Sequence, residues 1–420
     1  MLSQRWRWNL QRLTKRLWAR ATLFCLLGII TALIANVLSP YISYRLSKGL
    51  GADAVESILT ILASSMLTVT VFSLSTMVSA ASAAANGATP RATRLLLEDS
   101  TAQSALSTFL GGFLFSLVGI IALNSNYYGD GGRSVMFLVT LAVIGMIVVT
   151  LVQWIDYLAR LGRVGETIDL VEKTASTIMR QYVEDPDLGG TRLVSIPSDA
   201  LPVTTNSIGY LLHVDAGQLS AISDELDADI FLATRPGTYC SPVRPLAHVL
   251  PRGQDFDEQE ATRKILKAFS IGDDRSFDQD PRFGLVVLCE IGCRALSPAI
   301  NDSGTAIDVI GTLIRVLSPL AGIDREDREV KHPRLFVPRI SLEDFFEDAF
   351  LPLARDGASR VEVGLRLQKA AAALASMGRP ELTTAAEGFA ASALDRSLRA
   401  LEFQEDRDRL EREAFRSETH

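Results

Sequence analysis

A long run without charge is the feature that most constrains this chain. Residues 134–155 read SVMFLVTLAVIGMIVVTLVQWI and contain no ionisable side chain. A helix of that length crosses the roughly 30 Å hydrocarbon core of a bilayer. Three earlier stretches, 21–38, 57–90 and 100–129, are also free of charge. We therefore predict a transmembrane domain of four helices over residues 1–155.

Basic residues indicate the orientation of these spans. The first twenty residues contain six Arg or Lys and no acid, and further arginines follow the second and fourth spans. The opposite loops contain only Arg45, Lys48 and Arg133. The positive-inside rule then places both termini in the cytoplasm, and the expected location is a bacterial inner membrane. The lipid bilayer is thus the first expected partner.

The helical pattern continues beyond the fourth span. Apolar residues recur at alternating spacings of three and four, which is an a/d heptad repeat, until Pro186 ends it. We predict one continuous rod from 134 to 185, with residues 156–186 as a helical stalk and Gly162 and Gly165 as its weak points. The repeat predicts either a homo-oligomeric coiled coil or packing inside one subunit. Its positions are Leu161, Val164, Ile168, Val171, Ala175, Ile178 and Tyr182.

The second span is unusually rich in hydroxyl side chains. One reading is that small hydroxylated residues let helices approach closely, or that they bond back to their own backbone. The other is that they line a pore in an oligomer. No ionisable residue lies inside any predicted span, which argues against a proton-coupled transporter. The stripe consists of Ser57, Thr60, Ser64, Thr68, Ser75 and Ser79.

The remaining chain predicts an α+β cytoplasmic region. Residues 191–255 combine β-branched and aromatic runs with turn chemistry, which indicates a small β-barrel. Residues 256–420 predict a mainly helical cap, including helices over 283–296, 305–317, 342–354, 357–377 and 382–415 and one strand near 334–340. The whole chain is acidic, with a net charge of −7, so nucleic acid is not an expected partner.

Dense polar motifs between 272 and 317 suggest a relationship to known sequences. The chain resembles a bacterial family of predicted four-span membrane proteins of unknown function, whose signature reads R-A-L-S-P-G-[IT]-N-D-P-x-T-A. This sequence departs from the signature at Ala299 and Ser303, and at Ser276 in the preceding motif. The resemblance implies an architecture and brings no known reaction. The matching segments are Gly209–Asp215, Arg235–Tyr239, Arg275–Gly284 and Arg294–Ala306.

Five residues in this region form the predicted ligand site. Arg275, Asp280, Arg294, Asn301 and Asp302 read either as a structural ion-pair and capping network or as a pocket for a small anionic ligand at a helix N-terminus. We assign no catalytic residue, because no nucleophile–base pair is evident. The four scattered cysteines and four histidines suggest no metal site, and we expect no cofactor.

Three functional hypotheses follow from these patterns. The first is an oligomeric, channel-like or ligand-sensing membrane assembly, in which the second span lines the axis. The second is a membrane-tethered enzyme acting on an anionic substrate. The third is a non-catalytic scaffold or stress-sensing anchor.

Overall fold

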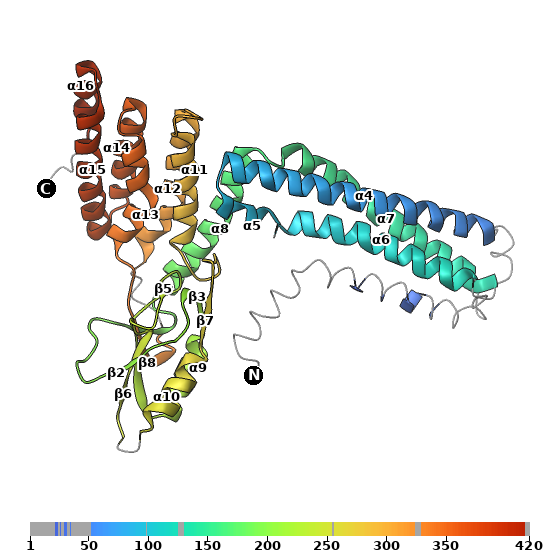
Figure 1. Ribbon diagram of the computed structural model, residues 1–420, viewed down its shortest axis with the longest axis horizontal. Helices are drawn as coiled ribbons and strands as arrows, with labels where there is room; N and C mark the ends of the chain where they lie inside the picture. Colours follow the sequence, from blue (N-terminus) through green and yellow to red (C-terminus); the bar gives the residue numbers. More distant parts are fainter. Residues whose placement is uncertain are drawn as a thin grey trace. The chain divides into compact units, whose positions relative to one another are not determined.

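The computed structural model describes residues 52–97, 99–124, 130–253, 256–323 and 329–415, with a few positions between 22 and 34. Most of the first predicted span, 21–38, lies outside the described residues. Contacts divide the described chain into two compact units. We call residues 52–86 and 93–166 the membrane unit, and residues 87–92 and 167–415 the C-terminal unit (Figure 1).

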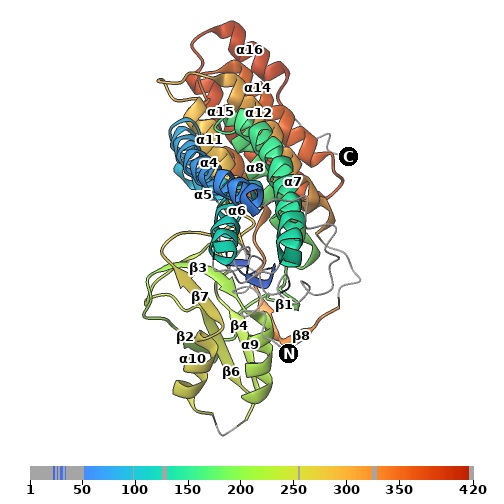
Figure 2. The same ribbon diagram turned by 90° about the vertical axis from the view of Figure 1, so that its right-hand side faces the viewer.

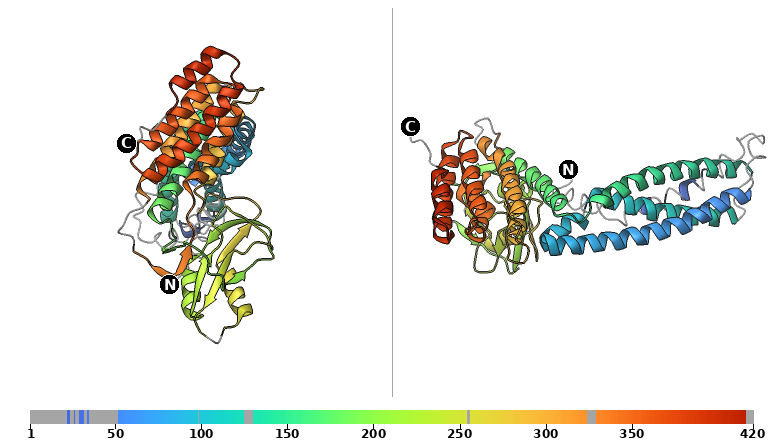
Figure 3. Two further views of the ribbon diagram at one scale, coloured as in Figure 1. Left: turned by 90° about the vertical axis from the view of Figure 1, so that its left-hand side faces the viewer. Right: turned by 90° about the horizontal axis from the view of Figure 1, so that it is seen from above.

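Three long helices run side by side in the membrane unit (Figure 3). Their shared interior is apolar, with Phe109, Phe115 and Met136 fully buried. Trp154 is also buried, and its indole N–H donates to the Ser73 hydroxyl at 2.8 Å, so a polar atom in the core has a partner. The helices are α4 (Ala52–Gly87), α6 (Ser100–Asn124) and α7 (Asp130–Arg160); the short α5 (Pro90–Leu97) precedes α6.

Four helices of the described chain are long and apolar enough to cross a membrane. Three of them, α4, α6 and α7, coincide with the second, third and fourth predicted spans. The other is α12 (Ser303–Leu317) with the turn that follows it. This helix carries Asp308 and Arg315, and its apolar face is buried against other helices of the C-terminal unit. Its hydropathy therefore also suits the core of a helical bundle.

The predicted continuous rod is interrupted. Helix α7 ends at Arg160 and α8 (Val164–Glu184) begins after three intervening residues, of which Gly162 has a φ of +86°. That backbone conformation is open to glycine and disfavoured for other residues. The heptad positions of α8 pack inside this chain, because Ile168, Val171 and Ala175 are buried. The repeat therefore needs no second copy of the chain to cover it.

The strands form two open sheets, so the predicted small barrel is not found. One sheet has five strands in the order β1-β8-β4-β6-β2, and the other has three in the order β5-β3-β7. Two of these strands come from beyond residue 255, which is why a closed unit over 191–255 does not form. The strands are β1 (Gly190–Arg192), β2 (Leu201–Val203), β3 (Gly209–Val214), β4 (Ala228–Leu232), β5 (Tyr239–Cys240), β6 (Ala247–Pro251), β7 (Phe269–Gly272) and β8 (His332–Val337).

The most buried strand, β4, lies at the centre of the larger sheet. Every residue of β4 is buried, as expected for a strand with neighbours on both sides and cover on its faces. It pairs antiparallel with β6 and parallel with β8, where Ile230 faces Leu335 in register. Helix α9 (Ala216–Glu225) packs on β4 and β8, and α10 (Glu258–Leu266) packs near β2 (Figure 2).

A layered bundle of helices forms the rest of the C-terminal unit (Figure 1). Helix α11 packs against α12 and α13, α12 against α14, and α15 against α13 and α14. The predicted final helix 382–415 is two helices, since the chain is extended at Leu401. The bundle contains α11 (Phe283–Ala295), α13 (Leu342–Asp356), α14 (Val361–Ala375), α15 (Pro380–Ala400) and α16 (Gln404–Arg412).

Candidate functional site

Arg275 and Asp280 lie together at the start of α11. The Arg275 side chain binds the Asp280 carboxylate with N–O distances of 2.9 and 2.7 Å, and its guanidinium lies 5.1 Å from the Phe283 ring centroid. The other oxygen of Asp280 accepts backbone N–H groups of Arg282 and Phe283, which are free at a helix N-terminus. The carboxylate is thus held by its own helix.

The backbone of Gly237 lies directly against the Asp280 carboxylate. Gly237, from the R-P-G-x-Y segment, has a φ of +94°, and a Cβ there would overlap the Asp280 carboxylate. Burial raises the pKa of Asp280, while Arg275 and the two N–H donors oppose that rise. The cluster therefore fixes the loop before α11 to the strand region, which is a structural role.

The other three predicted residues lie at the opposite end of α11. Asn301 adopts a left-handed conformation with a φ of +57°, and its N–H donates to the Ser297 carbonyl. Asp302 caps α12, since it accepts both the N–H and the hydroxyl of Thr305. These bonds lower the pKa of Asp302. The N-D pair of the signature is thus explained by a tight connection between two helices.

Arg294 differs from its neighbours in this connection. Its Nε atom is buried, and it has no hydrogen-bond partner among the described residues. Beside it, Arg360 donates to the Leu296 carbonyl and the Ser303 hydroxyl, so that guanidinium ties α14 to the connection.

The five predicted ligand residues do not form one pocket. Helix α11 has 13 residues, so its ends lie about 20 Å apart at 1.5 Å per residue. Arg275 and Asp280 are at one end, and Arg294, Asn301 and Asp302 at the other. The five residues are close in sequence, but in the structure they form two separate clusters, whose contacts are mainly structural.

Helix α11 itself makes two contacts that the sequence patterns do not predict. Gly284 lies directly against Ala175 of α8, and a Cβ at that glycine would come within 3.0 Å of the Ala175 Cα. Glu290 accepts the Thr89 hydroxyl at 2.8 Å and pairs with Arg91 at 2.6 Å. Residues 87–92 follow α4 in the chain but belong to the C-terminal unit. A lone Glu in an apolar helix was the only available signal for the second contact.

The hydroxyl stripe of α4 faces outward from the described bundle. All six predicted residues are exposed, whereas the helix packs through an opposite face that includes Leu59, Leu62 and Met66. Two of the hydroxyls bond to their own helix: Ser64 donates to the Ile61 carbonyl and Thr68 to the Ser64 carbonyl. The stripe therefore does not mediate packing among α4, α6 and α7. Its members are Ser57, Thr60, Ser64, Thr68, Ser75 and Ser79.

The described residues contain no cluster of three His, Cys, Asp or Glu side chains that could hold a metal ion. Cys289 and Cys293 lie one turn apart on α11; Cys289 is buried and Cys293 is half-buried. The hydrogen bond with the Cys289 thiol, together with burial, raises the pKa of Cys293, so the thiol form is favoured there.

Comparison with known proteins identifies the family to which this chain belongs. A family model described as "Predicted membrane protein (DUF2254)" matches residues 14–373. The chain belongs to the DUF2254 family. Uncharacterized proteins of Mycobacterium bovis and Mycobacterium tuberculosis are each 26% identical to it over 305 residues, or 70% of this chain. The chain aligns with 57% of the length of these curated relatives. No solved structure matches this DUF2254 chain.

Proposed function

We propose that the chain is a subunit of a homo-oligomeric, channel-like assembly in a bacterial inner membrane. In this proposal the hydroxyl face of α4 lines the axis, and the C-terminal unit lies in the cytoplasm and controls opening. The family assignment and the apolar helices support a membrane protein, and the channel is our interpretation of the geometry.

The outward position of the hydroxyl stripe is the observation that carries the proposal. Six polar side chains lie on the exposed side of an apolar helix and make no contact that packs the described bundle. If these hydroxyls faced lipid, they would gain no hydrogen-bond partner from it. If they faced the same residues in other copies of the chain, they would form an uncharged polar lining. The same helix has no ionisable residue between Ser57 and Gly87, which favours a neutral pore surface.

A link between α4 and the C-terminal unit supports control of opening. The turn after α4 is held by Glu290 through Thr89 and Arg91, and Ala88 and Ala92 beside them are buried. Helix α11 also packs on α8, the element that follows α7, at Gly284. Within the described residues, the segments that follow α4 and α7 thus both contact α11, which gives a physical route for coupling.

Conductance of the purified protein in planar bilayers tests the pore, and native mass spectrometry tests the number of copies. Thr68→Val replaces a hydroxyl by a methyl of similar size, so we expect a lower single-channel conductance. Thr70→Val is the matched control: Thr70 is on the opposite side of α4 and also bonds back to its own helix. A monomer, an absence of current, or equal effects of the two variants would refute the pore.

The coupling has a separate test. Glu290→Gln weakens the ion pair with Arg91 but keeps a side chain of the same shape, so the open probability should change while the unitary conductance stays the same. Glu362→Gln, on an exposed site of α14, is the control. If conductance exists and both variants behave like wild type, α11 does not transmit the signal. If no conductance exists, the scaffold hypothesis replaces the channel.

A further inference from the structure

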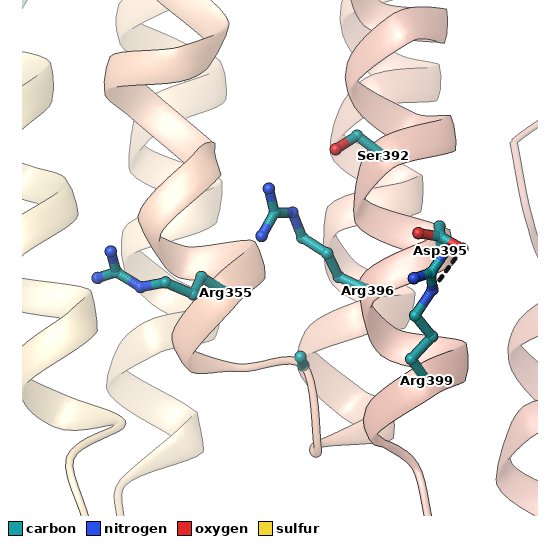
Figure 4. Close-up of a pocket in the computed structure, with 6 residues that line it drawn as sticks. Arg355, Ser392, Asp395, Arg396 and Arg399 are labelled. Atoms are coloured by element: carbon teal, nitrogen blue, oxygen red, sulfur yellow. Dashed lines mark hydrogen bonds and ion pairs between the residues drawn. The ribbon is translucent and has the colours of Figure 1, made fainter.

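A groove lined by arginines lies between the end of α13 and the C-terminal half of α15 (Figure 4). Its volume is about 460 Å³, within the range of small-ligand sites. It is far in sequence from the signature motifs, and all its residues belong to the C-terminal unit. The lining residues are Arg355, Ala358, Ser392, Asp395, Arg396 and Arg399.

The α15 side of the groove is a stripe along one helix face. Ser392, Arg396 and Arg399 follow one another at spacings of four and three, so their side chains lie on the same side of α15. Figure 4 shows the Ser392 hydroxyl and the Arg396 guanidinium pointing toward the same space beside α13. A hydroxyl one turn from a guanidinium offers donors that an anion can share.

The charges in the groove are not balanced. Arg399 is paired with Asp395 at 2.9 Å, and Arg355 is paired with the adjacent Asp356 at 2.7 Å. Arg396 forms no ion pair or hydrogen bond within the described part of the chain. The lining therefore contains three arginines and one carboxylate, Asp395, and the arginine without a partner among the described residues, Arg396, points into the groove.

The lining also indicates what kind of anion fits. Ala358 is the only apolar residue in it, so a nucleobase would find no aromatic surface and an acyl chain no apolar wall. Guanidinium groups bind phosphate oxygens with two parallel hydrogen bonds, which favours phosphate over a monodentate anion. We propose that this groove binds a compact phosphate-bearing polyanion, with Arg396 as the principal contact and Ser392 and Arg399 as further donors. This inference does not depend on whether the assembly conducts.

Titration calorimetry with inorganic pyrophosphate tests the proposal on the full-length chain in nanodiscs of zwitterionic lipid. We expect one binding site per chain, and Arg396→Gln should weaken affinity at least tenfold, since a charge-assisted contact is lost. Arg396→Lys keeps the charge but not the paired N–H donors of the guanidinium, so the loss of affinity should be smaller. Arg409→Gln, an exposed arginine on α16 outside the groove, should leave affinity within twofold of wild type.

A gain-of-affinity variant separates the site from general loss of structure. Asp395→Asn removes the carboxylate that competes for Arg399, so pyrophosphate should bind several-fold more tightly. No destabilised protein would mimic that result. Absence of binding in wild type, equal losses in Arg396→Gln and Arg409→Gln, or weaker binding by Asp395→Asn would each overturn the proposal.

The source of the phosphate is distinguished by a second set of nanodiscs that contain anionic lipid. If lipid headgroups occupy the groove, pyrophosphate affinity falls in these discs for wild type and not for Arg396→Gln. If the natural ligand is a free phosphate compound, affinity is the same in both lipids. Either result keeps the phosphate chemistry and assigns its origin.

Discussion

The close approach of α8 and α11 makes Gly284→Ala the sharpest test of the fold. The new Cβ would overlap the Ala175 side chain and come within 3.0 Å of its Cα, where ordinary contacts are 3.4–4 Å. Because the obstacle is backbone, the two helices must separate. Overpacking of this kind lowers the free energy of unfolding by about 1–3 kcal/mol.

A matched glycine removes the contribution of helix propensity. Gly165 is the second residue of α8, as Gly284 is of α11, and a Cβ there would meet nothing within 4 Å. Gly165→Ala should therefore stabilise slightly, by up to about 1 kcal/mol. The difference between the two variants is then about 2 kcal/mol, which corresponds to roughly 5 °C in the unfolding temperature of a unit of this size.

Thermal unfolding of the full-length protein in nanodiscs, followed by tryptophan fluorescence and circular dichroism, measures that difference. The pair Ala175→Gly and Gly284→Ala should show positive coupling in a double-mutant cycle, because the first change makes room for the second. If Gly284→Ala is as stable as Gly165→Ala, the two helices are not in contact at this point. The packing of the heptad face inside one chain would then lose its support.

Three further predictions concern the ends of α11. Arg275→Met should lower the free energy of unfolding by about 3 kcal/mol at neutral pH, since it leaves a buried carboxylate without its partner. The loss should shrink in urea titrations at lower pH, because the pKa of Asp280 is raised by burial and protonation removes the unpaired charge. Asn301→Val should cost about 1–2 kcal/mol and Asn301→Gly little, as the φ of +57° predicts. Asp302→Ala should cost about 1 kcal/mol for the lost cap. Because bonds from Thr305 lower its pKa, this contribution is present above about pH 4 and disappears as pH falls through the lowered value; stability measured from pH 7 to 2 checks it.

Local signals predicted the helices of the C-terminal unit well. Asp302 and Ser341 are residue types that favour N-caps and precede the predicted helices 305–317 and 342–354, and each accepts a backbone N–H of its helix. The α4, α6 and α7 spans were equally predictable from the sequence, since a charge-free run of this length has few structural alternatives to a membrane helix. These features depend on residues within one or two turns of each other.

Other predictions depended on features that a local pattern cannot distinguish. The heptad repeat predicts a buried helix face, and periodicity alone does not say whether the partner is another copy or α11 of the same chain. The rod required Gly162 to stay helical, and a glycine is equally able to leave the helix. The five site residues are close in sequence, but the 13-residue helix between them keeps them about 20 Å apart.

The interior place of β8 has a consequence for how this chain is made and divided. The sheet begins with β1 at Gly190, yet the strand between β1 and β4 starts only at His332. During synthesis, β1 and β4 each lack their β8 neighbour until α10, α11 and α12 have left the ribosome. Unpaired strand edges and a long sequence separation favour slow pairing and binding by chaperones. A protein cut at residue 255 would keep those edges exposed permanently, so we expect it to aggregate more than the full-length chain under the same conditions.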